Sequence, residues 1–136
     1  SRGLGDVYKR QVENIMHAGN ENAVILEGST LRSAIVEMSS KGLSMVTIVD
    51  QDKRLKGIIT DGDLRRMLER GVDVYNETVD NVMTKSPKWI EQREMAVNAL
   101  QKMSDLRITG MPVIDDAAGV AGSILMQDIY KAGIVR

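Results

Sequence analysis

The residues best suited to chemistry lie in one short motif in the first half of the chain. Gly57-x-x-Thr60-x-x-Asp63 falls where a β-branched run ends and a helical pattern begins. A threonine and an aspartate three residues apart at a helix start can form a capping box, in which each side chain bonds the other residue's backbone N–H. The same place suits a nucleotide, because a helix N-terminus offers N–H groups to phosphate and a carboxylate accepts from ribose hydroxyls. The motif therefore predicts a helix cap and, compatibly, a nucleotide site.

The motif belongs to a sequence that occurs twice. Val12-Glu-Asn-Ile-Met16 returns as Val79-Asp-Asn-Val-Met83, and the segment 57–63 returns in altered form as 122–128. The equivalent residues are 67 apart at the first pair (16 and 83) and 65 apart at the second (63 and 128). A fixed period marks a supersecondary unit that buries its apolar face against its copy. We therefore expect two halves related by a pseudo-twofold axis, with paired clefts.

Each copy is predicted to fold as β-α-β-β-α after a short helical turn, which is a mixed α/β (α+β) unit. In the first copy the turn starts at Val12 and a polar loop covers 20–22. The expected strands are 23–26, 45–49 and 55–60, the last two antiparallel, and the helices run from 29–30 to Gly42 and from Thr60 to Gly71. In the second copy we expect a turn at 79–83, strands at 89–90, 111–114 and 120–125, and helices at 95–106 and from 127. The copies then occupy 12–71 and 79–136, joined by 72–78. Residues 1–11 fit neither copy and are read as a linker, a cloning remnant or a misplaced flank.

Composition excludes several classes of function. The 136 residues have a net charge of −1 and no long basic run, which gives no reason to expect nucleic acid. The chain lacks a bilayer-length apolar run and a secretory signal pattern, so we expect a cytoplasmic protein without a membrane segment. It has no cysteine and one histidine, His17, so a metal site is not expected, and His17 is either a ligand contact or a solvated loop residue. The absence of a Walker-type loop also argues against a free-standing enzyme.

The doubled unit with its Gly-x-x-Thr-x-x-Asp motif resembles a tandem pair of cystathionine β-synthase (CBS) domains over residues 12–136. Such pairs bind adenosine or other nucleotides and regulate an attached enzyme or transporter. Three narrower stretches, 15–17, 60–66 and 127–135, resemble the regulatory part of sugar-phosphate isomerases of the arabinose 5-phosphate isomerase type. Those enzymes join a sugar isomerase (SIS) domain to a CBS pair and feed the synthesis of Kdo, a lipopolysaccharide sugar.

The resemblance implies two binding sites, each with ribose contacts from one copy and base contacts from the other. The first site would use Thr60, Asp63, Ser86, Arg107, Ile108 and Thr109, with Arg107 a candidate for phosphate. The second would use Val24, Leu43, Ser44 and Asp128. Leu125 stands where the first copy has Thr60, and a leucine side chain can neither accept nor donate a hydrogen bond. The second site therefore loses a bond of about 0.5–1.5 kcal/mol, and we expect the Asp63 site to be the better one.

The favoured function is a non-catalytic regulatory pair that needs no cofactor. A nucleotide such as AMP or ATP, or the nucleotide-sugar CMP-Kdo, would bind in the cleft and bias an SIS-type isomerase domain elsewhere in the full-length chain. The alternative is an assembly pair with empty clefts that only dimerises, and a homodimer of pairs is expected under both hypotheses.

Overall fold

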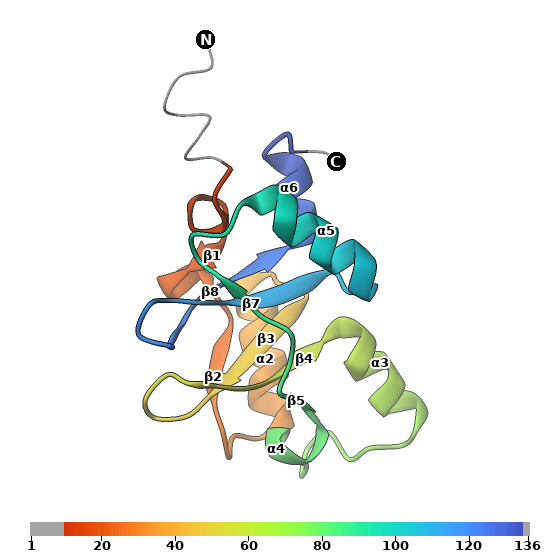
Figure 1. Cartoon of the computed structure of the whole chain (residues 1–136). Helices are drawn as coiled ribbons and strands as arrows, with labels where there is room; N and C mark the ends of the chain where they lie inside the picture. Colours follow the sequence, from red (N-terminus) through yellow and green to blue (C-terminus); the bar gives the residue numbers. More distant parts are fainter. Residues whose placement is uncertain (1–9, 135–136) are drawn as a thin grey trace. The chain divides into compact units, whose positions relative to one another are not determined.

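The computed structural model describes residues 10–134, which divide into two units (Figure 1). Among the described residues, unit 1 is formed from 10–19 and 88–134, and unit 2 from 20–87. The elements of unit 1 are η1 (Val12–Asn14), β1 (His17–Ala18), β6 (Ile90–Glu91), α5 (Ala96–Leu106), β7 (Gly110–Ile114), β8 (Val120–Leu125) and α6 (Met126–Lys131), with η2 (Gly19–Glu21) at the boundary. Those of unit 2 are β2 (Val24–Leu26), α2 (Leu31–Lys41), β3 (Met45–Val49), β4 (Leu55–Thr60), α3 (Asp61–Glu69), α4 (Val79–Val82) and β5 (Thr84–Lys85).

Unit 2 has a four-stranded sheet in the order β2-β3-β4-β5. β2 is parallel to β3, as expected for two strands joined by the helical crossover α2. β3 and β4 form an antiparallel hairpin in which Met45 lies opposite Thr60, so the start of β3 and the end of β4 share one edge. Every residue of β3 is buried, because this strand has sheet neighbours on both sides. The predicted strands 45–49 and 55–60 and their antiparallel pairing are confirmed.

Unit 1 repeats this plan with the sheet order β1-β8-β7-β6. β6 is parallel to β7, and β7 and β8 form the antiparallel hairpin with Gly110 opposite Leu125. The inward residues of α5, Ala96, Ala99, Leu100 and Met103, join Val12 and the strand residues in one apolar core. The first strand of this repeat is Ile90–Glu91, one residue later than predicted, because Trp89 is half exposed and precedes the ladder. The α/β class predicted from the repeat is confirmed.

The lead-in segment before each repeat pairs with the body of the other repeat. In unit 1 β1, which precedes the first repeat's strands, is antiparallel to β8, with His17 opposite Ser123. In unit 2 β5, which precedes the second repeat's strands, is antiparallel to β4, with Lys85 opposite Gly57. Neither two-residue strand could be predicted from the sequence, since neither has a hydrophobic run or a period of its own. Each unit is therefore assembled from two distant stretches of chain.

The glycine of each motif explains how the lead-in fits. A Cβ on Gly57 would lie 2.5 Å from Met83 Sδ and 2.8 Å from Thr84 O, closer than side-chain atoms pack. A Cβ on Gly122 would collide with His17 O and lie 2.8 Å from Met16 Sδ. The repeated methionine and the repeated glycine are thus partners across a strand pair. Gly57 and Gly122 therefore allow a neighbouring backbone to pass close to the strand.

The prediction for residues 1–11 lies outside the described residues except at its last two positions. Gln11 forms an antiparallel bridge with Met95, and Arg10 O accepts a hydrogen bond from Ala96 N. These two residues are therefore paired with the start of α5.

Candidate functional site

The first motif forms a complete capping box at the start of α3. Thr60 Oγ1 accepts from Asp63 N at 3.2 Å, and Asp63 Oδ2 accepts from Thr60 N at 2.9 Å. The second carboxylate oxygen, Oδ1, accepts from Arg66 Nη2 at 2.6 Å. The Asp63 side chain is 21% exposed and that of Arg66 is 63% exposed. The carboxylate is thus fixed by the helix start, while its charged partner lies mostly in solvent.

The second motif keeps only half of this box. Asp128 Oδ2 accepts from Leu125 N at 2.9 Å, but Leu125 has no side-chain oxygen that could accept from Asp128 N in return. Asp128 Oδ1 accepts from His17 Nε2 at 2.9 Å. The Asp128 side chain is 9% exposed and that of His17 is 27% exposed. His17 is a residue of strand β1, so the reading as a solvated loop residue is wrong, and its ring faces the second carboxylate.

The residue before the central hairpin of each unit contacts the helix start of the same unit. In unit 2 Ser44 O accepts from Asp61 N at 3.0 Å, next to Thr60. In unit 1 Thr109 O accepts from Met126 N at 2.8 Å, next to Leu125. Ser44, predicted for the second site, therefore lies beside the first motif, and Thr109, predicted for the first site, lies beside the second motif.

Val24 and Leu43 have their backbone N–H groups engaged within unit 2. Leu43 N donates to Met38 O, and Val24 N donates to Glu37 Oε2 at 3.2 Å. Partial burial raises the pKa of Glu37, but the bonds from Lys41 Nζ and Val24 N and the Lys41 charge outweigh it, so the pKa lies below its usual value. Glu37 thus remains ionised and holds the start of β2 against α2.

Two predicted site residues have left-handed backbone conformations. Ser86 has φ 50° and Arg107, which ends α5, has φ 57°. The left-handed region costs a residue with a Cβ about 1–2 kcal/mol. Glycine occupies the equivalent position in each other copy, as Gly19 with φ 56° and Gly42 with φ 66°. The chain therefore keeps a side chain at two positions where its own repeat uses glycine.

The structure brings some of the predicted residues together and separates others. Thr60, Asp63 and Ser44 lie at one edge of unit 2. Ser86 belongs to the same unit, but it follows Lys85, which lies opposite Gly57, and so is roughly 10 Å or more from Thr60 along the strands. Arg107, Ile108, Thr109 and Asp128 belong to unit 1. Their assignment to shared sites with unit 2 residues stays a prediction.

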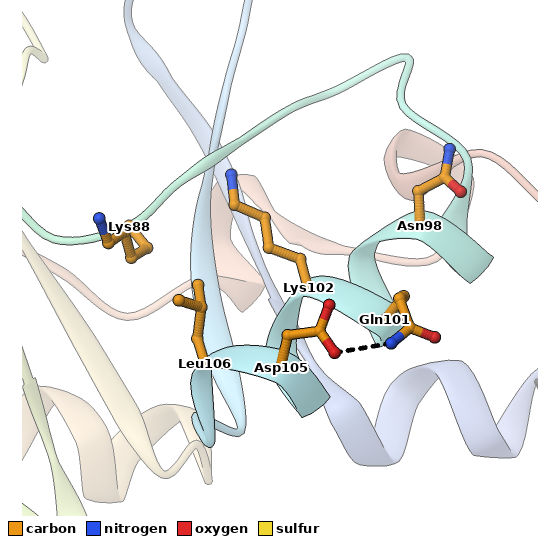
Figure 2. A pocket seen from close by; sticks show the side chains of 6 residues that line it. All are labelled: Lys88, Asn98, Gln101, Lys102, Asp105 and Leu106. Carbon is orange, nitrogen blue, oxygen red and sulfur yellow. Dashed lines mark hydrogen bonds between the residues drawn. The ribbon is translucent and has the colours of Figure 1, made fainter.

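Two hollows, one in each unit, have no motif residue in their lining. One of about 530 Å³ runs along α5, lined by Lys88, Asn98, Gln101, Lys102, Asp105 and Leu106 (Figure 2). Gln101 Nε2 donates to Asp105 Oδ1 at 2.7 Å there, and Lys102 Nζ donates to Trp89 O at 2.9 Å. A second hollow is lined by Leu26, Glu27, Asp50, Gln51 and Asp52. Neither hollow includes a motif residue, so we assign the nucleotide chemistry to neither.

Within residues 10–134, no three histidine or acidic side chains are grouped so that they could hold a metal ion. Over that range, no helix combines the length and apolar character needed to span a bilayer.

Solved structures similar to this one are CBS proteins. The CBS domain pair of protein MJ0100, in complex with 5′-methylthioadenosine and S-adenosyl-L-methionine, matches with a TM-score of 0.78 and 25% identity, covering 89% of this chain and 93% of that one. A CBS domain protein from Pyrobaculum aerophilum complexed with AMP matches with a TM-score of 0.79 and 16% identity, over 88% of this chain and 89% of that one. At 16% identity the second likeness concerns the fold alone.

Curated relatives give a sequence match at higher identity. The arabinose 5-phosphate isomerase KdsD of Pseudomonas aeruginosa is 40% identical over 132 residues, which is 97% of this chain and 40% of that protein. KdsD of Francisella tularensis is 42% identical over 128 residues, 94% of this chain and 39% of that protein. This chain thus spans about two fifths of the length of these relatives. The sequence model of the CBS domain matches residues 12–70 and again 79–134. With two matches over nearly its whole length, the chain belongs to the CBS-domain family, as a pair of regulatory rather than catalytic domains.

Proposed function

We propose that this chain is the ligand-sensing regulatory pair of an arabinose 5-phosphate isomerase-like enzyme. The support is the alignment of 97% of the chain with only 40% of the P. aeruginosa isomerase. The remaining length of such a protein would hold the SIS-type isomerase domain. The pair itself requires no cofactor, and it acts in the cytoplasm, where nucleotides are available as signals.

The observation that carries the binding proposal is the state of the Asp63 carboxylate. One oxygen is fixed by Thr60 N, and the other is held by Arg66, whose side chain is 63% exposed. Exposed ion pairs contribute only about 0.2–1 kcal/mol, so Arg66 can leave Oδ1 at small cost. A ribose hydroxyl then donates to Oδ1, and the Arg66 guanidinium is free to meet a phosphate.

The carboxylates of the two motifs differ in how accessible they are to a ligand, which supports two sites of unequal affinity. Asp63 is 21% exposed beside an arginine whose side chain is 63% exposed, whereas Asp128 is 9% exposed beside a histidine held in a strand. Leu125 also lacks the hydroxyl that Thr60 provides. We therefore propose Thr60 and Asp63 as the stronger site and Asp128 as the weaker one.

The ligand we propose is a nucleotide, with AMP, ATP and CMP-Kdo as candidates. Each has a ribose and at least one phosphate, which match the carboxylate and the cationic side chains described above. CMP-Kdo has the further attraction that it would report the output of an isomerase feeding Kdo synthesis. A ligand with different affinity for two arrangements of the pair shifts their populations and so regulates the attached enzyme.

Calorimetric titration with AMP, ATP and CMP-Kdo tests the proposal. Asp63→Asn keeps an oxygen for the Thr60 N bond but loses the charge, so affinity should fall at least tenfold, as expected for a charged hydrogen bond. Asp116→Asn is the matched control, because Asp116 is 61% exposed and pairs with Arg93 away from the motifs. Equal affinity of the Asp63→Asn and control proteins would refute the site, and binding of AMP without CMP-Kdo would refute the end-product ligand.

A ligand-free assembly role is the second candidate, favoured by exposed apolar side chains. Leu68 on α3 is 65% exposed and Val36 on α2 is 60% exposed. Apolar side chains on helix faces are suited to a homodimer contact. In this alternative, Leu68→Glu dissociates a dimer seen by sedimentation, and none of the three nucleotides changes the sedimentation of the unaltered chain.

A further inference from the structure

The contact between His17 and Asp128 has no counterpart in the other unit. The residue equivalent to His17 is Thr84, 67 positions later, which is exposed and lies opposite Ile58 in the β4–β5 pair. Asp63 Oδ1 instead accepts from Arg66, a residue of its own helix. The two carboxylates are thus held by different means: one by a side chain in solvent, the other by the lead-in strand.

The chemistry of the contact fixes the role of the imidazole. A carboxylate oxygen can only accept, so His17 Nε2 carries the hydrogen and donates it to Asp128 Oδ1 at 2.9 Å. Asp128 Oδ2 is already engaged by Leu125 N at 2.9 Å. With the Asp128 side chain 9% exposed, the imidazole covers the oxygen that an incoming hydroxyl group would need.

The imidazole is tied to the position of β1. β1 has only two residues, and it lies so close to β8 that a Cβ on Gly122 would collide with His17 O. Upstream, Val12 is fully buried and its N–H donates to Glu94 O at 2.9 Å, so η1 is anchored separately. The part that can yield is therefore short: the strand His17–Ala18 and the adjoining Gly19, which is the last residue of unit 1 before the chain enters unit 2.

We propose that His17 is a built-in competitor for the Asp128 carboxylate. A ribose hydroxyl that binds Asp128 displaces the imidazole and loosens β1 from β8, and by reciprocity a loosened β1 raises the affinity of that site. The inference rests on the proposed nucleotide function and names the regulation of its weaker site. In this proposal the lead-in segment, rather than the body of either repeat, responds to the ligand.

Amide hydrogen exchange tests the contact without any ligand. His17→Ala should raise the exchange rates of the β1 amides about tenfold, and Asp128→Ala, which removes both carboxylate oxygens, should do the same. His17→Gln keeps a side-chain N–H donor and should restore most of the protection. Thr84→Ala, at the equivalent position of unit 2, is the control and should leave β1 unchanged. Unchanged β1 exchange in His17→Ala would overturn the proposal even if nucleotides bind.

AMP titration then separates this inference from the proposed function. In an Asp63→Asn background, which leaves the second site as the intact one, His17→Ala should bind AMP about tenfold more tightly than the His17 protein, and AMP should accelerate β1 exchange. AMP binding without a change in β1 exchange would overturn the competitor role and leave the proposed function standing. Failure of AMP, ATP and CMP-Kdo to bind the unaltered chain would overturn the proposed function and the ligand-linked displacement together, while the exchange experiment still judges the contact.

Discussion

Replacing Gly57 by alanine tests whether the motif glycine exists to admit the lead-in of the other repeat. The added Cβ would lie 2.5 Å from Met83 Sδ, 2.7 Å from Met83 Cγ and 2.8 Å from Thr84 O. Met83 is flexible and can turn aside. Thr84 O is backbone, and moving it disturbs the pairing of Thr84 with Ile58.

The expected magnitude follows from the cost of overpacking. Adding a methyl group to a filled contact costs about 1–3 kcal/mol, and we expect that loss in the free energy of unfolding. Gly62→Ala, five positions later, is the matched control. A Cβ on Gly62 would meet Arg66 Nη1 at 3.4 Å, an ordinary contact, and the residue lies in helix α3. Alanine there should stabilise by up to about 1 kcal/mol, so the same chemical change has opposite signs at the two sites.

Urea unfolding followed by far-ultraviolet circular dichroism measures both variants. Fluorescence of Trp89, the one tryptophan, reports on the unfolding of unit 1. The urea midpoint that it measures should change little in Gly57→Ala, because Gly57 belongs to unit 2. In a double-mutant cycle, Met83→Ala should relieve part of the Gly57→Ala loss, since two of the three close contacts are to Met83 atoms. A Gly57→Ala protein as stable as the parent would refute the close-packing explanation, and a full rescue by Met83→Ala would refute the part assigned to the backbone.

Three further changes have defined outcomes. Arg107→Gly should raise the free energy of unfolding in urea by about 1 kcal/mol, because glycine relieves the left-handed backbone, and it should weaken AMP binding in calorimetry. Gly42→Ala, at the equivalent position of the first repeat, should lower the free energy of unfolding instead. Thr47→Val should stabilise by about 1 kcal/mol in thermal unfolding, since Thr47 is fully buried and its hydroxyl has no hydrogen-bond partner among the described residues; a loss of stability would contradict this. The pKa of Glu37 is lowered on folding, so its contribution to stability is fully present above the usual value of 4.5 and is lost as the pH falls through the folded value. In urea unfolding from pH 6 to about 3, Glu37→Gln should therefore reduce the loss of stability towards acid pH. An unchanged loss would exclude the pair of Glu37 with Lys41 as its cause.

Most of the elements could be predicted because their signals are local. The buried run at 45–49 and the strand at 55–60 have the predicted bounds, and Thr60 caps α3 as its spacing to Asp63 indicates. The pairing of β1 with β8 could not be predicted, because two residues carry no period and their partner is more than 100 positions away in sequence. A signal was nevertheless present: each motif glycine recurs with a methionine that precedes the other repeat.

The local contacts of the two motifs could be predicted from the types of their residues, but the residues that lie next to them in the fold could not. The carboxylates of Asp63 and Asp128 were recognisable from the repeat, and the weaker cap at Leu125 from one substitution. The His17 contact was not, because it depends on the exchange of lead-in strands. Ser86 belongs to the unit of Thr60 because the lead-in strands are exchanged, and its place in the Thr60 site stays a prediction. Local chemistry could thus be inferred from sequence, but tertiary neighbours required the topology.

The exchanged lead-ins set an order of assembly during synthesis. Unit 2 needs no residue beyond Pro87, so its sheet can close while the second half of the chain is still within or near the ribosome. Val12 and β1 precede unit 2 in the sequence, yet their partner β8 extends to Leu125. The segment 12–18 must therefore wait for its partner strand until β8 has emerged, so unit 1 matures after unit 2.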